Sequence, residues 1–207
     1  MKTISVGYDG TLVGTLMETG GRIVFEYDPL FISSGHELSP LNLPLGPGLR
    51  ARGLTATARL PGLFEDSLPD QWGERLMHEW FRQRGHATHD VTPLMMLAYV
   101  GRRGMGALVY EPEIEGSSGS DRVNLDDLHE AAIQVEQVGA IDLDVLAAVG
   151  SSAGGARPKV LIVLPCDPAG AMLAGVGEIP ANYEAYLVKL DTSRDGFAGP
   201  LEEAYVQ

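Results

Sequence analysis

β-Branched and apolar residues gather in three short runs within the first thirty residues, which is typical of β-strands. The runs TISVGY (3–8) and TLVGTL (11–16) flank Asp9-Gly10, a two-residue turn signal that supplies positive φ. A third run, RIVFEY, covers residues 22–27. The pattern predicts that an antiparallel β-meander opens the protein.

The stretch from residue 28 to residue 63 has a different character. It is dense in Pro, Gly and Ser, with LNLPLGPG at its centre. We expect it to be mostly irregular, with at most one short edge strand, because these residues favour turns and loops.

From Ser67 the spacing of apolar residues becomes helical. Ser67 and Asp70 form a pattern similar to a capping box, Pro69 suits the first helical turn, and Gly85 ends the run. The residues at helical spacing are Trp72, Leu76, Met77, Trp80 and Phe81. We expect them to be buried core, because burial is the usual role of aromatic rings.

A second helix is predicted to begin at Thr92-Pro93 and to end at Gly101, and residues 104–112 (GMGALVYEP) return to the pattern of a strand. The segment EPEIEGSSGSD, which follows, combines acidic residues with a Gly/Ser cluster, as interdomain linkers do. We therefore predict two domains, at residues 1–115 and 122–207.

The second predicted domain begins with a helix. Asn124 suits the N-cap of LDDLHEAAIQVEQV, and Asp126 and Asp127 lie in the first turn, where the helix dipole favours negative charge. A shorter helix, LDVLAAV, is expected to end at Gly150. The strands PKVLIVLP and EAYLVKLD follow, with a turn near Asp167-Pro168 between them. The whole pattern predicts an α+β fold in which an antiparallel sheet with helices precedes a second lobe.

Composition excludes several classes of protein. The formal net charge of −13 would repel a phosphate backbone, so we expect no direct binding to nucleic acid. No apolar run reaches 18 residues and the N-terminus lacks the plan of a secretion signal, so we expect a cytoplasmic protein without a membrane segment. The single cysteine, Cys166, has no partner for a disulfide, and we expect it to be inert packing. The histidines lack the spacing of metal ligands.

The segment from Val149 to Val160, VGSSAGGARPKV, is the richest in candidate chemistry. Gly150, Gly154 and Gly155 let a ligand approach the main chain, which is the physical basis of loops that hold phosphate. The segment matches neither GxxxxGK[ST] nor GxGxxG. By itself it could equally be a connection between a helix and a strand.

Lys189 lies among apolar residues in the strand AYLVKLD, where an unpaired ammonium group would be costly. One interpretation is that it contacts ATP phosphates and pairs with Glu202 or Glu203, as the strand lysine of a kinase small lobe pairs with a glutamate. The other is that it lies on the solvent face of an edge strand. The alternation of Leu187, Lys189 and Asp191 is compatible with both.

GSSAGGARPKV, followed by YLVKLD and LEEAY, resembles the glycine-rich loop, ATP-contacting strand and first lobe helix of HipA-type toxin serine/threonine kinases. The resemblance extends over nearly the whole chain. In order, VGYDGTLVGTL, FEYDPLFISSGHELSPLNLPL, LFEDSLPDQWGERL and GRRGMGALVYEPE resemble successive blocks of that family's N-terminal subdomain. The resemblance implies that residues 1–115 are this subdomain and that residues 122–207 are part of a kinase small lobe.

The same resemblance assigns roles to residues of the second domain. Gly154, Gly155 and Ala156 would line the triphosphate of ATP, Lys189 would hold its phosphates, and Glu203 would orient Lys189. Ser152, with Ser151 beside it, would be a regulatory phosphorylation site, because a phosphate there occupies space that ATP needs. Arg157 and Lys159 are weaker candidates. The alternative for Arg157 is an exposed loop charge, and the alternative for Lys159 is a side chain that points to water.

The resemblance also implies that residues 1–207 lack two groups that a kinase needs, the catalytic carboxylate and the Mg²⁺ ligands. In HipA-type kinases the catalytic carboxylate and the Mg²⁺ ligands belong to a large lobe, which would follow residue 207. We read the carboxylates of Glu65, Asp66 and Asp70 as structural. The stop at AYVQ would fall inside a helix, so we expect a truncated kinase fragment, with self-association covering the exposed face.

Two functions therefore follow from the sequence. The first is an ATP-binding half-site of a HipA-like kinase, whose partner would be a DNA-binding antitoxin of the HipB type. The second is a non-catalytic binding module, in which residues 1–115 dock an antitoxin or a separately encoded kinase core.

Overall fold

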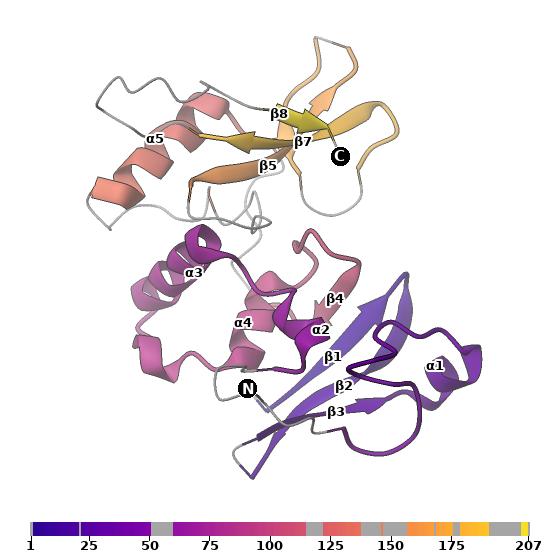
Figure 1. Ribbon diagram of the computed structural model, residues 1–207. Coiled ribbons are helices and arrows are strands. Elements are labelled where there is room, and N and C mark those ends of the chain that lie inside the picture. Colours follow the sequence, from indigo (N-terminus) through magenta and orange to yellow (C-terminus); the bar gives the residue numbers. More distant parts are fainter. Residues whose placement is uncertain are drawn as a thin grey trace. The chain divides into compact units, whose positions relative to one another are not determined.

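The computed structural model describes residues 2–20, 22–50, 60–114, 122–137, 146, 157–167, 169–175, 179–190 and 204–206. By its contacts the chain divides into two compact units. Unit 1 comprises Met1–Leu68 and Val91–Ile114, and unit 2 comprises Pro69–Asp90 and Glu115–Gln207. Each unit combines helices with an antiparallel sheet, which confirms the predicted α+β class (Figure 1). The predicted domain limits at residues 115 and 122 stay a prediction.

The sheet of unit 1 has the strand order β3-β2-β1-β4, and all its pairs are antiparallel. Its strands are β1 (Thr3–Tyr8), β2 (Thr11–Thr19), β3 (Arg22–Tyr27) and β4 (Leu108–Glu111). Asp9 and Gly10 have φ values of 47° and 70°, as a tight hairpin turn requires. The predicted meander and the later strand are confirmed.

Unit 1 also contains α1 (Pro29–Ser34), α2 (Gly62–Glu65) and α4 (Pro93–Val100). The expectation of an irregular stretch at 28–63 is wrong for α1. Asp28 caps this helix by accepting hydrogen bonds from the N–H groups of Leu30 and Phe31, and Gly35 ends it with a φ of 73°. The Asp-Pro pair that begins α1 is a helix-start signal that the density of Pro, Gly and Ser concealed.

Helix α4 begins and ends where the sequence predicts. The Thr92 hydroxyl accepts a hydrogen bond from the Met95 N–H at 3.3 Å, and Gly101 follows the last turn. The helix packs on β1 and β4. It contributes to a core whose members include Ile4, Val6, Leu16, Phe25, Phe31, Phe64, Leu94, Leu97 and Tyr110. Unit 1 therefore has a hydrophobic core of its own.

Two tyrosines carry hydroxyl groups into this core. Tyr110 donates a hydrogen bond to the Ser67 hydroxyl at 2.6 Å, and Tyr27 donates one to the Leu43 carbonyl at 2.7 Å. Burial raises the pKa of both phenols above the ordinary value of 10.0. The neutral phenol is thus the form that the folded protein stabilises.

The raised pKa of Tyr110 predicts how unit 1 responds to alkali. Below pH 10 the phenol is neutral in both the folded and the unfolded chain, and the contribution to stability is complete. Above that pH only the unfolded chain releases the proton readily, so the free energy of unfolding should fall as pH rises. We expect Tyr110→Phe to be less stable by about 1 kcal/mol at neutral pH, because a hydrogen bond is lost, but to decline less steeply in alkali. Urea unfolding followed by circular dichroism at several pH values checks this, and parallel declines would contradict it.

The helices of unit 2 are α3 (Gln71–Gln83), the short 3₁₀ helix η1 (Thr88–Asp90) and α5 (Leu125–Gln137). Asp70, rather than Ser67, is the N-cap of α3, because its carboxylate accepts a hydrogen bond from the Gly73 N–H at 2.8 Å. The predicted apolar face of α3 is confirmed, since all five of its members are buried: Trp72, Leu76, Met77, Trp80 and Phe81. Asn124 accepts a hydrogen bond from the Asp126 N–H, which confirms the predicted cap of α5.

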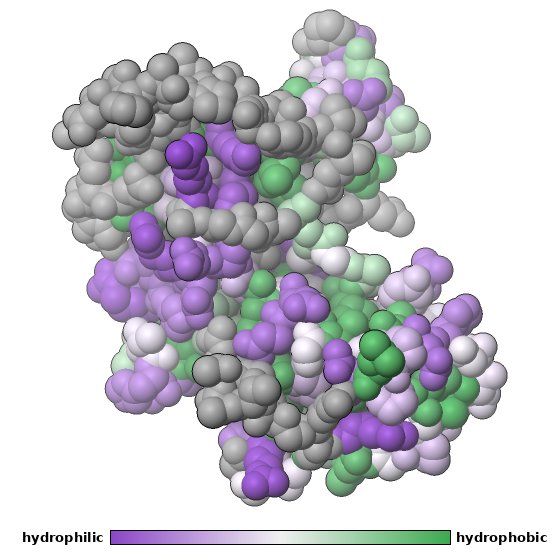
Figure 2. All heavy atoms as spheres, viewed as in Figure 1, coloured by the Kyte–Doolittle hydropathy of each residue, from purple (hydrophilic) through white to green (hydrophobic). Residues whose placement is uncertain are grey.

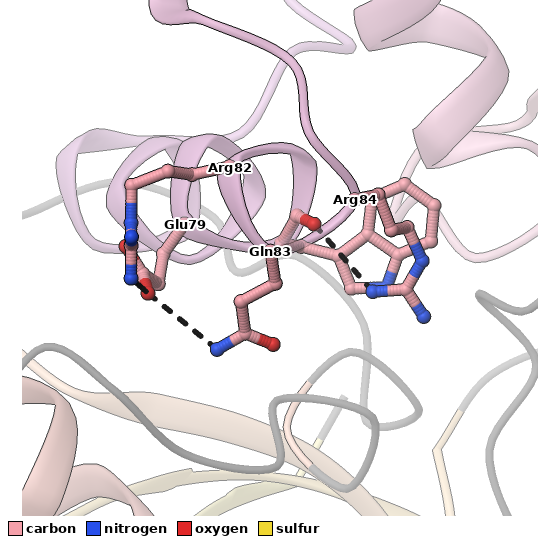
Figure 3. A network of polar contacts seen from close by, with 5 residues as sticks. Glu79, Arg82, Gln83 and Arg84 are labelled. Atoms are coloured by element: carbon pink, nitrogen blue, oxygen red, sulfur yellow. Dashed lines mark hydrogen bonds and ion pairs between the residues drawn. The ribbon is translucent and has the colours of Figure 1, made fainter.

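The opposite face of α3 carries pairs of polar side chains (Figure 3). The Arg82 Nε donates to Glu79 at 2.6 Å, and this hydrogen bond lowers the pKa of the Glu79 carboxyl. At the C-cap of the helix, the Arg84 guanidinium lies 3.8 Å from the centre of the ring of Trp80, which belongs to the buried face. Helix α3 thus has one face with polar side chains and one buried apolar face. In Figure 2, hydrophobic residues also reach the molecular surface among hydrophilic ones.

The sheet of unit 2 has the order β6-β5-β7-β8. Its strands are β5 (Lys159–Pro165), β6 (Leu173–Ala174), β7 (Tyr183–Lys189) and β8 (Ala204–Val206). The expectation that AYVQ lies in a helix is wrong, because β8 pairs antiparallel with β7, with Tyr205 opposite Leu187. Tyr and Val favour strands, and β7 offers the backbone groups that they pair with.

Two further expectations concern Cys166 and membranes. Cys166 is exposed at the end of β5, so its expected role as buried packing is wrong. Its backbone N–H bonds to the Asn182 carbonyl at the turn between strands, where the side chain faces away from the core. Among the described helices, none combines the length and apolar character needed to span a bilayer.

Candidate functional site

The register of β5 and β7 brings two segments of the predicted site together. Lys159, the first residue of β5, lies directly opposite Lys189, the last residue of β7. Just beyond this pair, the Leu190 N–H donates to the Pro158 carbonyl at 2.9 Å. Arg157 and Pro158 are the described end of the glycine-rich segment. Pro158 and Lys189 therefore lie at the same end of the sheet, where β5 begins and β7 ends.

Lys189 is half-buried and lies on an interior strand. Because β7 is flanked by β5 and β8, the interpretation of Lys189 as part of an edge strand is wrong. Directly opposed residues of an antiparallel pair share one face of the sheet, with Cβ atoms about 4.5–5.5 Å apart. The Lys159 and Lys189 side chains consequently leave the same face. Two like charges so placed repel each other unless a carboxylate lies nearby.

That carboxylate is Asp70. Its Oδ2 accepts a hydrogen bond from the Lys159 Nζ at 2.7 Å, and the exposed fractions of the two side chains are 8% and 4%. The alternative in which Lys159 points to water is therefore wrong. A buried ammonium needs a partner of opposite charge, and the N-cap of α3 supplies it.

The other predicted site residues have different outcomes. Arg157 is exposed, which agrees with the alternative of an exposed loop charge. Six other residues of the predicted site lie outside the described residues: Gly154, Gly155, Ala156, Glu203, Ser151 and Ser152. Their assigned roles stay predictions.

Sequence reasoning missed the role of Asp70, which it treated as structural only. A signal was present, because Lys159 begins a strongly apolar strand and a lysine there requires a carboxylate if it is buried. The identity of the partner was not readable from local pattern, since 89 residues separate the two.

The arrangement has a definite chemical character. Two ammonium groups and one carboxylate lie at one end of the sheet. The segment rich in glycine adjoins them, and backbone N–H groups of such segments bind anions. Ammonium groups and backbone N–H groups are both donors, so these groups can donate hydrogen bonds to an anion. In the described part of the chain, no group of three His, Cys, Asp or Glu side chains could hold a metal ion.

Comparison with known proteins gives one family. A search of curated proteins found no match. The family model described as the HipA N-terminal domain matches residues 4–111, just over half of the chain. This range contains β2, β3 and β4, all of β1 except Thr3, and Asp70. The chain therefore belongs to the HipA-type toxin family.

Proposed function

We propose that this chain supplies the ATP-binding half-site of a HipA-like serine/threonine kinase. One observation supports the proposal above all others: the pairing of Lys159 with Lys189 sets the end of the glycine-rich segment beside Lys189. Kinase small lobes use this combination, a glycine-rich loop over the phosphates and a lysine on a neighbouring strand.

Each part has a role that its chemistry suits. Gly154, Gly155 and Ala156 offer backbone N–H groups to the triphosphate, and Lys189 neutralises phosphate charge. Glu203 pairs with Lys189 and orients it. ATP would carry Mg²⁺, and we assign neither the Mg²⁺ ligands nor the catalytic carboxylate to the described residues. The proposed partner is a DNA-binding antitoxin.

Lys189→Met should weaken ATP binding by about tenfold or more, because it removes a charge-assisted contact while keeping the apolar stem. The matched control is Lys2→Met, since Lys2 is exposed on unit 1. Isothermal titration with ATP measures the affinity. Equal affinities of the two variants would contradict the assignment.

The chain contains three lysines, Lys2, Lys159 and Lys189, which permits a direct test of location. An acyl-phosphate derivative of ATP transfers its acyl group to an amine beside the bound phosphates. We expect labelling of Lys189, blocked by excess ATP, and none at Lys2. Mass spectrometry of the digested protein identifies the labelled lysine.

Ser152 is the proposed regulatory site, since a phosphate there adds about −1.5 to −2 charges next to the ATP phosphates. Ser152→Asp should weaken ATP binding by about tenfold, whereas Ser152→Ala should leave it unchanged. The same two substitutions at Ser151 show which serine carries the effect. Unchanged binding in both aspartate variants would contradict this regulation.

A second candidate function is a binding module that docks an antitoxin or a separately encoded kinase core. The hydrophobic core of unit 1 favours it, because a unit with its own core can fold and act without a catalytic site. Size-exclusion chromatography of the chain with a purified helix-turn-helix antitoxin tests this function. Binding that survives Lys189→Met would support the module independently of ATP.

A further inference from the structure

Asp70 uses its two carboxylate oxygens for two different tasks. Oδ1 accepts the hydrogen bond from the Gly73 N–H that caps α3, and Oδ2 accepts the hydrogen bond from Lys159. The positive end of the helix dipole and the ammonium group both stabilise its negative charge. Because both side chains of the ion pair are buried, its geometry is fixed from the helix on one side and from the sheet on the other.

The ion pair acts at the point where the proposed site begins. Lys159 is the first residue of β5, it adjoins the glycine-rich segment, and it lies directly opposite Lys189. A displacement of Lys159 would therefore move the end of that segment and the neighbouring strand together. The Asp70 charge also offsets the repulsion between the two cross-strand ammonium groups.

We propose that Asp70 is a positioning residue of the nucleotide site. It anchors the start of β5 to the N-terminus of α3, and so it sets the location of Lys189 and of Pro158, which lies in the described end of the glycine-rich segment. This inference rests on the proposed function for its effect on ATP. Asp70 acts through Lys159 and makes no contact with the nucleotide itself.

The two tasks of Asp70 can be separated by substitution. Asp70→Asn keeps an oxygen that caps α3 about as well as aspartate does, but it removes the charge that holds Lys159. The double variant Asp70→Asn/Lys159→Met also removes the buried ammonium and keeps its apolar stem. Tryptophan fluorescence during urea unfolding reports the stability of unit 2, because both tryptophans, Trp72 and Trp80, lie in α3.

Two readouts test positioning. The first is hydrogen exchange of the backbone amides in residues 157–165 and 183–190, which needs no ligand. The second is ATP affinity together with acyl-phosphate labelling of Lys189. In Asp70→Asn we expect faster exchange in both segments and an affinity about tenfold weaker than in the unchanged protein.

The double variant distinguishes positioning from a merely structural role. Removing both charges should return the unfolding midpoint toward that of the unchanged protein, since neither charge of the ion pair remains buried. If Asp70 positions the site, ATP affinity stays weak in this variant. Recovery of affinity along with the midpoint would overturn the inference.

The failure of this inference and the failure of the proposed function give different results. If the unchanged protein binds no ATP, the proposed function fails, and the exchange measurement alone decides whether Asp70 anchors β5. If the unchanged protein binds ATP while Asp70→Asn alters neither exchange nor affinity, the inference fails and the proposed function stands.

Discussion

Gly14→Ala is expected to destabilise unit 1 by about 3 kcal/mol, which is at the upper end for overpacking a core. A Cβ atom at Gly14 would lie 2.2 Å from the Glu26 carbonyl oxygen and 2.6 Å from the Phe25 ring. The carbonyl belongs to β3, which pairs with β2 along its length, and the Phe25 side chain is fully buried. Neither neighbour can move without disturbing the sheet.

Gly7→Ala is the matched control, since Gly7 lies in the neighbouring strand β1. A Cβ atom there would meet its nearest neighbour at 3.7 Å, an ordinary contact. Unit 1 has no tryptophan, so its stability is best followed by hydrogen exchange of peptides from residues 3–27. Equal exchange rates in the two alanine variants would contradict the prediction, because they would show that β3 can move to accommodate the added Cβ atom.

Lys159→Met is expected to destabilise unit 2 by about 3 kcal/mol, because it leaves the Asp70 carboxylate buried without its partner. Breaking a buried ion pair from one side costs more than removing an exposed one, since water cannot replace the lost partner. Urea unfolding followed by tryptophan fluorescence measures the loss.

Arg82→Met provides the comparison within the same unit. It removes the partner of Glu79, and because the exposed fractions of the Arg82 and Glu79 side chains are 59% and 15%, water reaches this pair more freely than the Asp70–Lys159 pair. The unfolding midpoint should therefore fall less than in Lys159→Met. If both variants unfold at the midpoint of the unchanged protein, the Asp70–Lys159 pair contributes nothing measurable to unit 2.

Much of the fold was readable from local pattern. The meander, both of its turn residues, the apolar face of α3 and the caps of α4 and α5 depend on neighbours within a few positions along the chain. Helix caps and tight turns need particular residues at particular places, so they leave a signal in the sequence. The resemblance to HipA-type proteins followed from the order of such blocks, and the family match confirms it.

Errors arose where two signals competed or where a distant segment decided the outcome. The Pro and Gly density of 28–63 hid the cap of α1, because the same residues begin helices and form loops. The segment around Tyr205 forms a strand because it pairs with β7. Local propensity does not indicate which strand a segment will pair with.

The glycine-rich segment and Lys189 became candidates from the sequence by itself, because glycines and a lysine are residue types that can hold phosphate. The tertiary structure alone decided that Lys189 lies opposite Lys159 and that Lys159 pairs with Asp70. The physical reason is that a buried charge requires a partner without specifying which one. Strand register and the packing of α3 select Asp70, and both depend on contacts between residues far apart in the chain.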